Sequence, residues 1–389
     1  MIRKVLLSAS LVAGLFPALT VLGQNPGAAP RQSFDQLLQA AEKAREESRD
    51  DEAIRLFRSA LAETPDSEEA LWFLGTVLFE KQQYAEARDL LRQFLTLRPD
   101  AGPAWALLGM SEYELRQYHR ALDHLQRAIE LGMGDRKELA KSVYYDVAIL
   151  LTRFERYDDS LDLQMKMLTA EPQQPDLVLP AGLASLRLPY LPTEVPQSRH
   201  DLIELAGQAV TALLTQRQAD AAARFKRMAE AYSTEQGVHF LYGAYLMQVH
   251  PDQAVGEFER ELEISPTNVL ARVRLAEQQI AQGELDRALT LAEQAIKIEP
   301  KHASAHMVAG EALLAKGNSE AGIKELEIAR EDDPMNMRIH LHLLRAYAAA
   351  GRKEDAEREK KETEKLYRGS SSVTSQSLGE SSHEPPASQ

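Results

Sequence analysis

The sequence predicts an all-α protein, a solenoid of repeated helical hairpins, and three observations lead to this fold class. Pro266, Pro300 and Pro334 are each 34 residues apart. Small residues recur at fixed offsets before these prolines, for example Gly310 and Gly322 before Pro334. Helix-forming residues dominate, whereas alternating Val, Ile and Thr runs are missing. A unit of this length holds two helices but cannot bury both alone, so we expect the rest of the chain to consist of copies.

Composition excludes several classes of function. The 389 residues are 44% hydrophobic and contain no cysteine, which rules out disulfides, thiol nucleophiles and cysteine metal sites. The formal net charge is −14 and no block of Lys and Arg occurs. Nucleic acid and anionic membrane surfaces require such basic patches. We therefore expect no nucleic-acid partner and an acidic, water-exposed surface.

Residues 1–23 have the pattern of a signal peptide. A positive head at Arg3 and Lys4 precedes the apolar run Val5 to Leu22, and Gly23 stands at a plausible cleavage site. Residues 24–32 are a polar linker. We expect export to the periplasm or cell envelope, or secretion, with no membrane insertion after cleavage. The alternative is an uncleaved anchor, since the run approaches the minimum length of a membrane span.

Residues 33–172 are predicted to form an N-terminal lobe of about four repeats. Pro65 and Pro99 are again 34 residues apart, and the fourth repeat ends at Pro172. The third repeat lacks the proline, but a glycine-rich turn at 132–134 takes its place. The proline ends a second helix because it pushes the residue before it out of the α region.

Two copies carry the pattern most clearly. Their positions are Leu71, Leu74, Gly75, Leu78, Ala87, Leu91 and Pro99 in one, and Trp105, Leu108, Gly109, Ala121, Leu125 and Ala128 in the other. This pattern resembles the tetratricopeptide repeat (TPR) family, and the resemblance covers residues 33–367. It implies a superhelix in which the first helix of each repeat lines a concave groove that holds peptides or partner segments.

The period fails between Pro172 and Pro266, which are 94 residues apart where two repeats need 68. The segment 173–199 reads as a single helix from Asp176 to Leu188, followed by a loop with three prolines. We expect this helix to be unpaired and the loop 189–199 to be mobile or irregularly packed. The segment is either a degenerate repeat that lost its second helix, or a hinge or docking loop.

The period resumes in a predicted C-terminal lobe, residues 200–367. About four repeats are followed by a capping helix, 352–367, which is charged nearly all round and suits the polar outer face of a terminal unit. Residues 369–389 are rich in Ser, Gly and Pro and are expected to be disordered. The predicted architecture is thus two lobes separated by an irregular Pro-rich segment.

Catalytic and metal-binding motifs are missing from the sequence. It has no glycine-rich phosphate loop, no G-x-S-x-G and no H-E-x-x-H. His302 and His306 have the spacing of two ligands on one helix face, but no third ligand accompanies them. We expect no catalytic residue, no metal and no cofactor, and hence no enzyme.

The groove positions implied by the resemblance are aromatic and apolar in the N-terminal lobe. They give the predicted partner-binding residues Trp72, Phe79, Met110, Tyr113, Tyr145 and Ile149. The alternative is that these side chains pack between neighbouring helices. The predicted function is a non-catalytic scaffold that binds a peptide or partner protein in its groove. The alternative function is a membrane-tethered accessory subunit of a cell-envelope enzyme or of an export or assembly machine.

Overall fold

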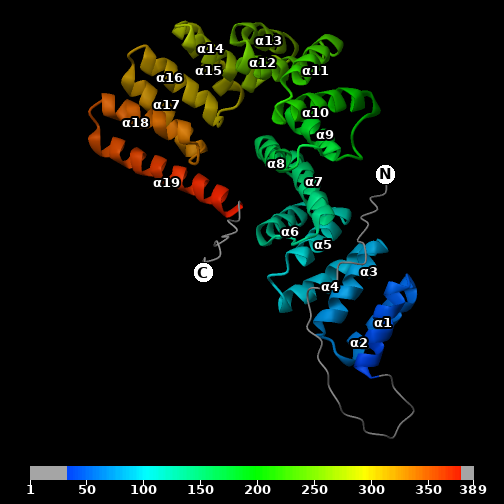
Figure 1. Ribbon diagram of the computed structural model, residues 1–389. Coiled ribbons are helices and arrows are strands. Elements are labelled where there is room, and N and C mark those ends of the chain that lie inside the picture. Colours follow the sequence, from blue (N-terminus) through cyan, green and yellow to red (C-terminus); the bar gives the residue numbers. More distant parts are fainter. Residues whose placement is uncertain (1–32, 378–389) are drawn as a thin grey trace, which may run out of the picture. The chain divides into compact units, whose positions relative to one another are not determined.

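The computed structural model describes residues 33–377, and in this range every helix longer than one turn is α-helical and no strand occurs (Figure 1). The signal-peptide and linker expectations for 1–32 lie outside the described residues, as does the predicted tail from 378 to 389. The all-α, helical-hairpin fold class is confirmed. Helices of one hairpin run antiparallel and pack side by side.

The first ten helices are α1 (Phe34–Glu46), α2 (Asp50–Glu63), α3 (Glu68–Glu80), α4 (Tyr84–Leu97), α5 (Gly102–Glu114), α6 (Tyr118–Leu131), α7 (Lys137–Arg153), α8 (Tyr157–Ala170), α9 (Val178–Ser185) and α10 (His200–Leu214). Short 3-10 turns, η2 (Pro175–Leu177) and η3 (Gln197–Arg199), precede α9 and α10. The later helices are α11 (Gln218–Ala231), α12 (Val238–Val249), α13 (Pro251–Ile264), α14 (Val269–Ala281), α15 (Leu285–Ile298), α16 (Ala303–Ala315), α17 (Ser319–Asp332), α18 (Met337–Ala349) and α19 (Lys353–Ser377).

The turn inside each hairpin repeats the 34-residue period in its backbone angles. A residue with φ between 57° and 61° stands at Ser48, Gln82 and Arg116, and the corresponding turns later in the chain use Gly283 and Gly317. The left-handed conformation lets the chain reverse within three residues, and it costs glycine least. The period read from prolines is therefore also a period of turns.

Close approach of the two helices explains the small residues of the pattern. A Cβ added at Gly109 would lie 2.7 Å from Leu125 Cγ, and one at Gly310 would lie 2.8 Å from Leu326 Cγ. Leu125 and Leu326 are fully buried on the second helices. The first helix needs glycine at these positions because any side chain would push its partner helix away.

The chain divides into two compact units, which differ from the predicted lobes. Unit 1 ends at Arg224 and unit 2 begins at Phe225, inside α11. The irregular segment 173–199 was expected to separate the lobes, but it lies within unit 1. Contacts made by α9 with α7, α8 and α10 account for this difference.

The helix at 178–185 is not unpaired, which corrects the sequence-based expectation. It packs closely on α10 through two facing glycines. A Cβ on Gly182 would lie 2.0 Å from the Ile203 carbonyl oxygen, and one on Gly207 would lie 1.9 Å from the Val178 carbonyl oxygen. The two backbones touch, so α9 and α10 form a hairpin of their own.

The proline-rich loop is irregular, as expected, but it is anchored to the repeats before it. The Nη1 atom of Arg153, at the end of α7, donates to the Pro189 carbonyl oxygen at 2.8 Å and also to the Glu194 carboxylate at 3.0 Å. Arg187 lies over the Tyr157 ring at 5.1 Å, and Leu191 is buried. These contacts hold both ends of the loop against α7 and α8.

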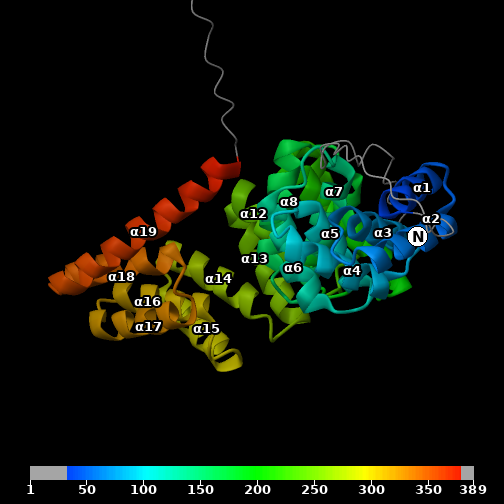
Figure 2. The ribbon, with the colours of Figure 1, turned by 90° about the horizontal axis from the view of Figure 1, so that it is seen from below.

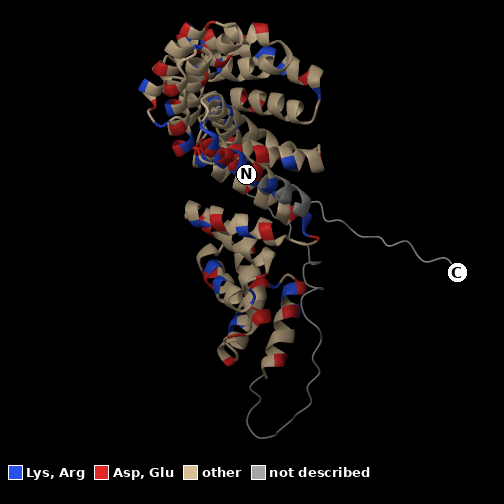
Figure 3. Ribbon diagram, turned by 90° about the vertical axis from the view of Figure 1, so that its left-hand side faces the viewer, with Lys and Arg blue, Asp and Glu red and all other residues tan. Residues whose placement is uncertain are grey.

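Unit 2 ends with α18 and α19, which lie side by side (Figure 2). The last helix runs to Ser377, so residues 369–377 continue it, whereas the sequence predicted disorder from 369. Extending an existing helix needs no new nucleation, and polar residues can therefore follow on from a helix that packs. Acidic and basic residues are intermixed along the helices of both units (Figure 3).

Candidate functional site

Four of the six predicted partner-binding residues are buried in the core of unit 1. Trp72, Phe79, Met110 and Ile149 are between 0% and 7% exposed. Tyr113 on α5 is partly exposed, and so is Tyr145 on α7. The structure does not test binding, but it gives the four buried side chains a packing role. Contact with a partner is sterically open only at the two tyrosines.

Phe79 and Tyr113 occupy equivalent positions in successive repeats, and each forms the same kind of ring pair. Phe79 meets Tyr84 edge-on with ring centroids 5.5 Å apart, and Tyr113 meets Tyr118 edge-on at 5.7 Å. Each pair joins the end of a first helix to the start of the next helix, which closes the turn between them. Edge-to-face contacts of this kind stabilise a fold beyond the area they bury.

Trp72 forms part of the lining of a small cavity in unit 1, of about 160 Å³. Its ring contacts Phe94 on α4, with centroids 5.4 Å apart. The cavity also borders Arg98 and Gly102, where the chain enters α5. At this volume it accommodates one side chain and not a peptide, so it cannot be the whole of a partner groove.

Two carboxyl groups meet on neighbouring first helices of unit 1. Glu69 on α3 hydrogen-bonds with Glu42 on α1, and both are half-buried. Burial, followed by the charge of Glu42 and by this hydrogen bond, raises the pKa of Glu69 to about 7. The Glu69 carboxyl therefore keeps its proton over the weakly acidic range.

The Glu69 carboxyl predicts a loss of stability with rising pH. Its proton is retained in the folded state up to about pH 7 but leaves the unfolded chain near pH 4.5. The free energy of unfolding should therefore fall as pH rises between these values, by about 1–2 kcal/mol for a carboxyl partly screened by water. Urea denaturation at several pH values in this range gives the free energy of unfolding as a function of pH. This pH dependence should be weaker for Glu69→Gln than for wild type, and unchanged for Glu63→Gln, which replaces an exposed side chain. An equal pH dependence in wild type and Glu69→Gln would contradict the raised pKa of Glu69.

Buried glutamates held between an arginine and a histidine recur in both units. In unit 1, Glu112 is fully buried and lies 2.6 Å from His124 and 2.5 Å from Arg92. Burial raises the pKa of Glu112, but the hydrogen bonds from His124 and Arg92 outweigh burial and hold it below its ordinary value. In unit 2, Glu359 lies between His340 and Arg330.

The pair His302 and His306, considered above as metal ligands, has other partners. His306 Nδ1 lies 2.7 Å from Glu325, and its Nε2 lies 3.0 Å from the Pro300 carbonyl oxygen. The Nδ1 atom of His302 accepts the Ala305 N–H and so caps α16. No group of three or more His, Asp and Glu side chains within residues 33–377 is arranged to hold a metal ion.

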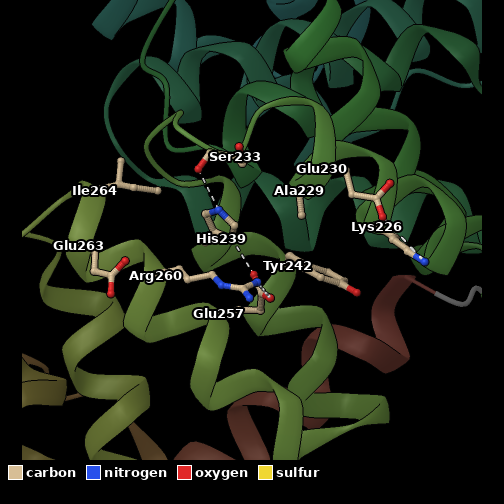
Figure 4. Close-up of a pocket in the computed structure, with 10 residues that line it drawn as sticks. All are labelled: Lys226, Ala229, Glu230, Ser233, His239, Tyr242, Glu257, Arg260, Glu263 and Ile264. Carbon is tan, nitrogen blue, oxygen red and sulfur yellow. Dashed lines mark hydrogen bonds and ion pairs between the residues drawn. The ribbon is translucent and has the colours of Figure 1, made fainter.

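A depression of about 510 Å³ in unit 2 lies between α11, α12 and α13 (Figure 4). Its lining residues are Lys226, Ala229, Glu230, Ser233, His239, Tyr242, Glu257, Arg260, Glu263 and Ile264. Most of its charges are paired with one another, since Lys226 lies 3.8 Å from Glu230 and Glu257 contacts both Arg260 and His239 at 2.6 Å. The depression therefore offers little unbalanced charge to a ligand.

Sequence reasoning missed a third buried glutamate of unit 2, besides Glu257 and Glu359. Glu261 on α13 is fully buried and accepts the backbone N–H groups of Gly237 at 2.9 Å and Phe240 at 3.2 Å, at the start of α12. It also accepts from Asn268 at 2.9 Å. A carboxylate at a helix N-terminus is stabilised by the unpaired N–H groups there. Its place opposite a glycine turn is visible only in three dimensions.

The described helices include none that is both long enough and apolar enough to span a membrane.

Comparison with solved structures finds other helical repeat proteins. A MamA protein from Desulfovibrio magneticus, residues 41 to the end, is 20% identical, with 44% of this chain and 97% of that chain covered and a TM-score of 0.36. A MamA double mutant has a TM-score of 0.39 at 20% identity, covering 44% of this chain and 98% of that one. The Cut9–Hcn1 complex of the APC/C gives 0.42 at 12% identity, covering 86% and 87%.

Family models give a more direct result. No curated protein matches this chain. One model described as tetratricopeptide repeat matches residues 44–110, 245–310 and 279–336, and a second model of the same description matches 107–175. These ranges span more than half of the 389 residues and coincide with the hairpins seen in the structure. The chain belongs to the tetratricopeptide repeat family.

Proposed function

We propose that this chain is an exported scaffold that binds an apolar segment of a partner protein on the first helices of unit 1. Tetratricopeptide repeat proteins are in general non-catalytic scaffolds for protein–protein interaction. Export is supported by the signal-like pattern of residues 1–23. Mass spectrometry of the mature N-terminus tests it, since an intact Met1 end would favour the membrane-tethered accessory subunit instead.

The observation that carries the binding proposal is the pair of partly exposed tyrosines on neighbouring first helices. Tyr113 is on α5 and Tyr145 on α7, and α5 and α7 are in contact within unit 1. Tyrosines supply large contact area at low entropic cost and combine an apolar ring with a hydroxyl, which suits them to interfaces. Met110 on α5 and Ile149 on α7 are buried, so both helices are packed into the core of unit 1.

Site-specific photo-crosslinking tests this surface in cells. A photoreactive residue at position 113 or 145 should capture a defined partner, and one at Met165, a 43% exposed side chain on the second helix α8, should not. Equal capture at all three positions would contradict a first-helix site. The result also identifies the partner, because the captured protein can be sequenced by mass spectrometry.

The double substitution Tyr113→Ser, Tyr145→Ser gives the matching loss-of-function result. Capture by a photoreactive residue elsewhere on α5 or α7 should fall about tenfold or more, because aromatic anchors dominate binding at such surfaces. The circular dichroism should stay close to wild type because both rings are partly exposed, and the melting temperature should fall only modestly, through loss of the Tyr113–Tyr118 ring contact. By contrast, Phe79→Ser should destabilise unit 1, because Phe79 is only 7% exposed. Any loss of binding in this variant would then follow from unfolding.

A further inference from the structure

A second surface, on the first helices of unit 2, carries a set of charged residues that the binding proposal for unit 1 does not use. We call it the arginine face. Its residues are Arg274 and Glu277 on α14, Glu311 on α16, and Arg338, His342 and Arg345 on α18. On α18 the three positions are spaced four and three residues apart, which places them along one side of the helix.

Two arginines of this face already hold a carboxylate. Arg274 lies 2.9 Å from Glu277, and Arg338 reaches from α18 to the same carboxylate at 3.1 Å, although the two residues are 61 positions apart. The Glu277 side chain is only 13% exposed, whereas Arg338 is 54% exposed. The arrangement shows that guanidinium groups from α14 and α18 converge on one acidic group across α16.

Arg345 has no such acidic partner. It is exposed, and within residues 33–377 it makes no ion pair or hydrogen bond. The one acidic residue that α16 contributes to the face, Glu311, lies 4.0 Å from His342 instead. A guanidinium always keeps its positive charge, so Arg345 presents an unbalanced cation in a chain whose formal charge is −14.

His342 adds little charge to the face at neutral pH. Burial lowers its pKa, and the positive charges of Arg338 and Arg345 lower it further, against the opposite effects of Glu311 and Glu277. The positive charge therefore comes from arginines, with Leu341 of α18 partly exposed beside Arg345. This combination matches an acidic segment with apolar side chains between its acids.

We propose that the arginine face binds an acidic segment of a partner protein, with one partner carboxylate on Arg345 and another toward Arg338. This proposal rests on the scaffold function proposed above in one respect: it assumes that the ligand is a protein. The two arginines are seven residues apart on α18, about 10 Å at helical rise. An extended segment spans this distance with acids at every third residue. Because the chain has a formal net charge of −14, no general attraction for acidic ligands is expected, and binding should depend on these arginines.

Fluorescence anisotropy with a dye-labelled synthetic peptide tests this directly. The probe is a short extended peptide with Glu at every third position and Leu or Ser between, and its control replaces each Glu with Gln. The full mature protein should bind the Glu peptide and not the Gln peptide. Arg345→Gln should weaken binding about tenfold, the usual effect of losing one charge-assisted pair, and the melting temperature should not change because Arg345 makes no internal bond.

A matched variant separates local recognition from general charge. Arg227→Gln removes the same charge from the second helix α11 of unit 2, where Arg227 is exposed, and it should leave binding unchanged. Equal weakening by Arg227→Gln, no effect of Arg345→Gln, or equal binding of the two peptides would each overturn the proposal. The crosslinking test at Tyr113 and Tyr145 is independent, so capture there with no peptide binding here would overturn only the acidic-segment inference.

Discussion

Replacing Gly207 with alanine is expected to lower the stability of unit 1 by about 3 kcal/mol, at the upper end of the range for overpacked sites. The added methyl group would lie 1.9 Å from the Val178 carbonyl oxygen and 3.0 Å from the Gly182 nitrogen. These are backbone atoms, so no side chain can rotate out of the way, and α9 must move off α10. The measurement is urea denaturation followed by circular dichroism. Gly182→Ala should behave in the same way, because its methyl group would lie 2.0 Å from the Ile203 carbonyl oxygen.

Gly256→Ala is the matched control, and its effect should have the opposite sign. Gly256 lies inside α13, and a Cβ there meets no atom within 4 Å. Alanine in an open helix position stabilises the helix by about 0.5–1 kcal/mol relative to glycine. If Gly207→Ala were as stable as wild type, the close contact between α9 and α10 would be wrong.

Replacing Glu261 with glutamine should destabilise unit 2 by about 3 kcal/mol, since breaking a buried charged network has a cost of this order. The carboxylate accepts two bonds from the Gly237 N–H, at 2.9 Å and 3.1 Å, and one each from Phe240 and Asn268. An amide of the same size offers only one oxygen, and its NH₂ group faces donors. The start of α12 would then lose its cap, which denaturation of the full chain should report as a lower midpoint.

Glu263→Gln serves as the control, because this exposed glutamate is on the same helix two residues further on. It removes one negative charge without touching the α12 cap and should change stability by less than about 0.5 kcal/mol. A midpoint for Glu261→Gln equal to that of Glu263→Gln would show that the buried carboxylate contributes nothing to the cap. A proteolysis time course should also show earlier cleavage near the 231–238 turn in Glu261→Gln alone.

The candidate binding residues illustrate a limit of helical periodicity. On α3 every residue from Ala70 to Phe79 is buried, so the helix is apolar on all sides and its pattern does not show which side faces solvent. Trp72 and Phe79 could therefore be placed on a first helix from the sequence, but not on its exposed or its buried side. The structure leaves Tyr113 and Tyr145 as the two partly exposed members of the predicted set.

The arginine face could not be predicted from the sequence either, because it also depends on how the helices pack. Arg338 and Glu277 are 61 residues apart and meet because two first helices of the solenoid lie on either side of a third. The repeat pattern predicts which helices are neighbours, but the reach of a long side chain across a helix depends on small differences in packing. The lack of a partner for Arg345 is likewise a property of its surroundings in space.

The sequence by itself determined the fold class, the 34-residue period and the turns of the regular repeats. These features depend on interactions between residues close in the chain, such as the proline that ends a helix and the small residue that admits its partner. Only the tertiary structure decided that α9 pairs with α10, that the compact units divide at Arg224, and which groove positions remain exposed. Those outcomes depend on how irregular segments and individual side chains pack in space, and such packing leaves no period in a single sequence.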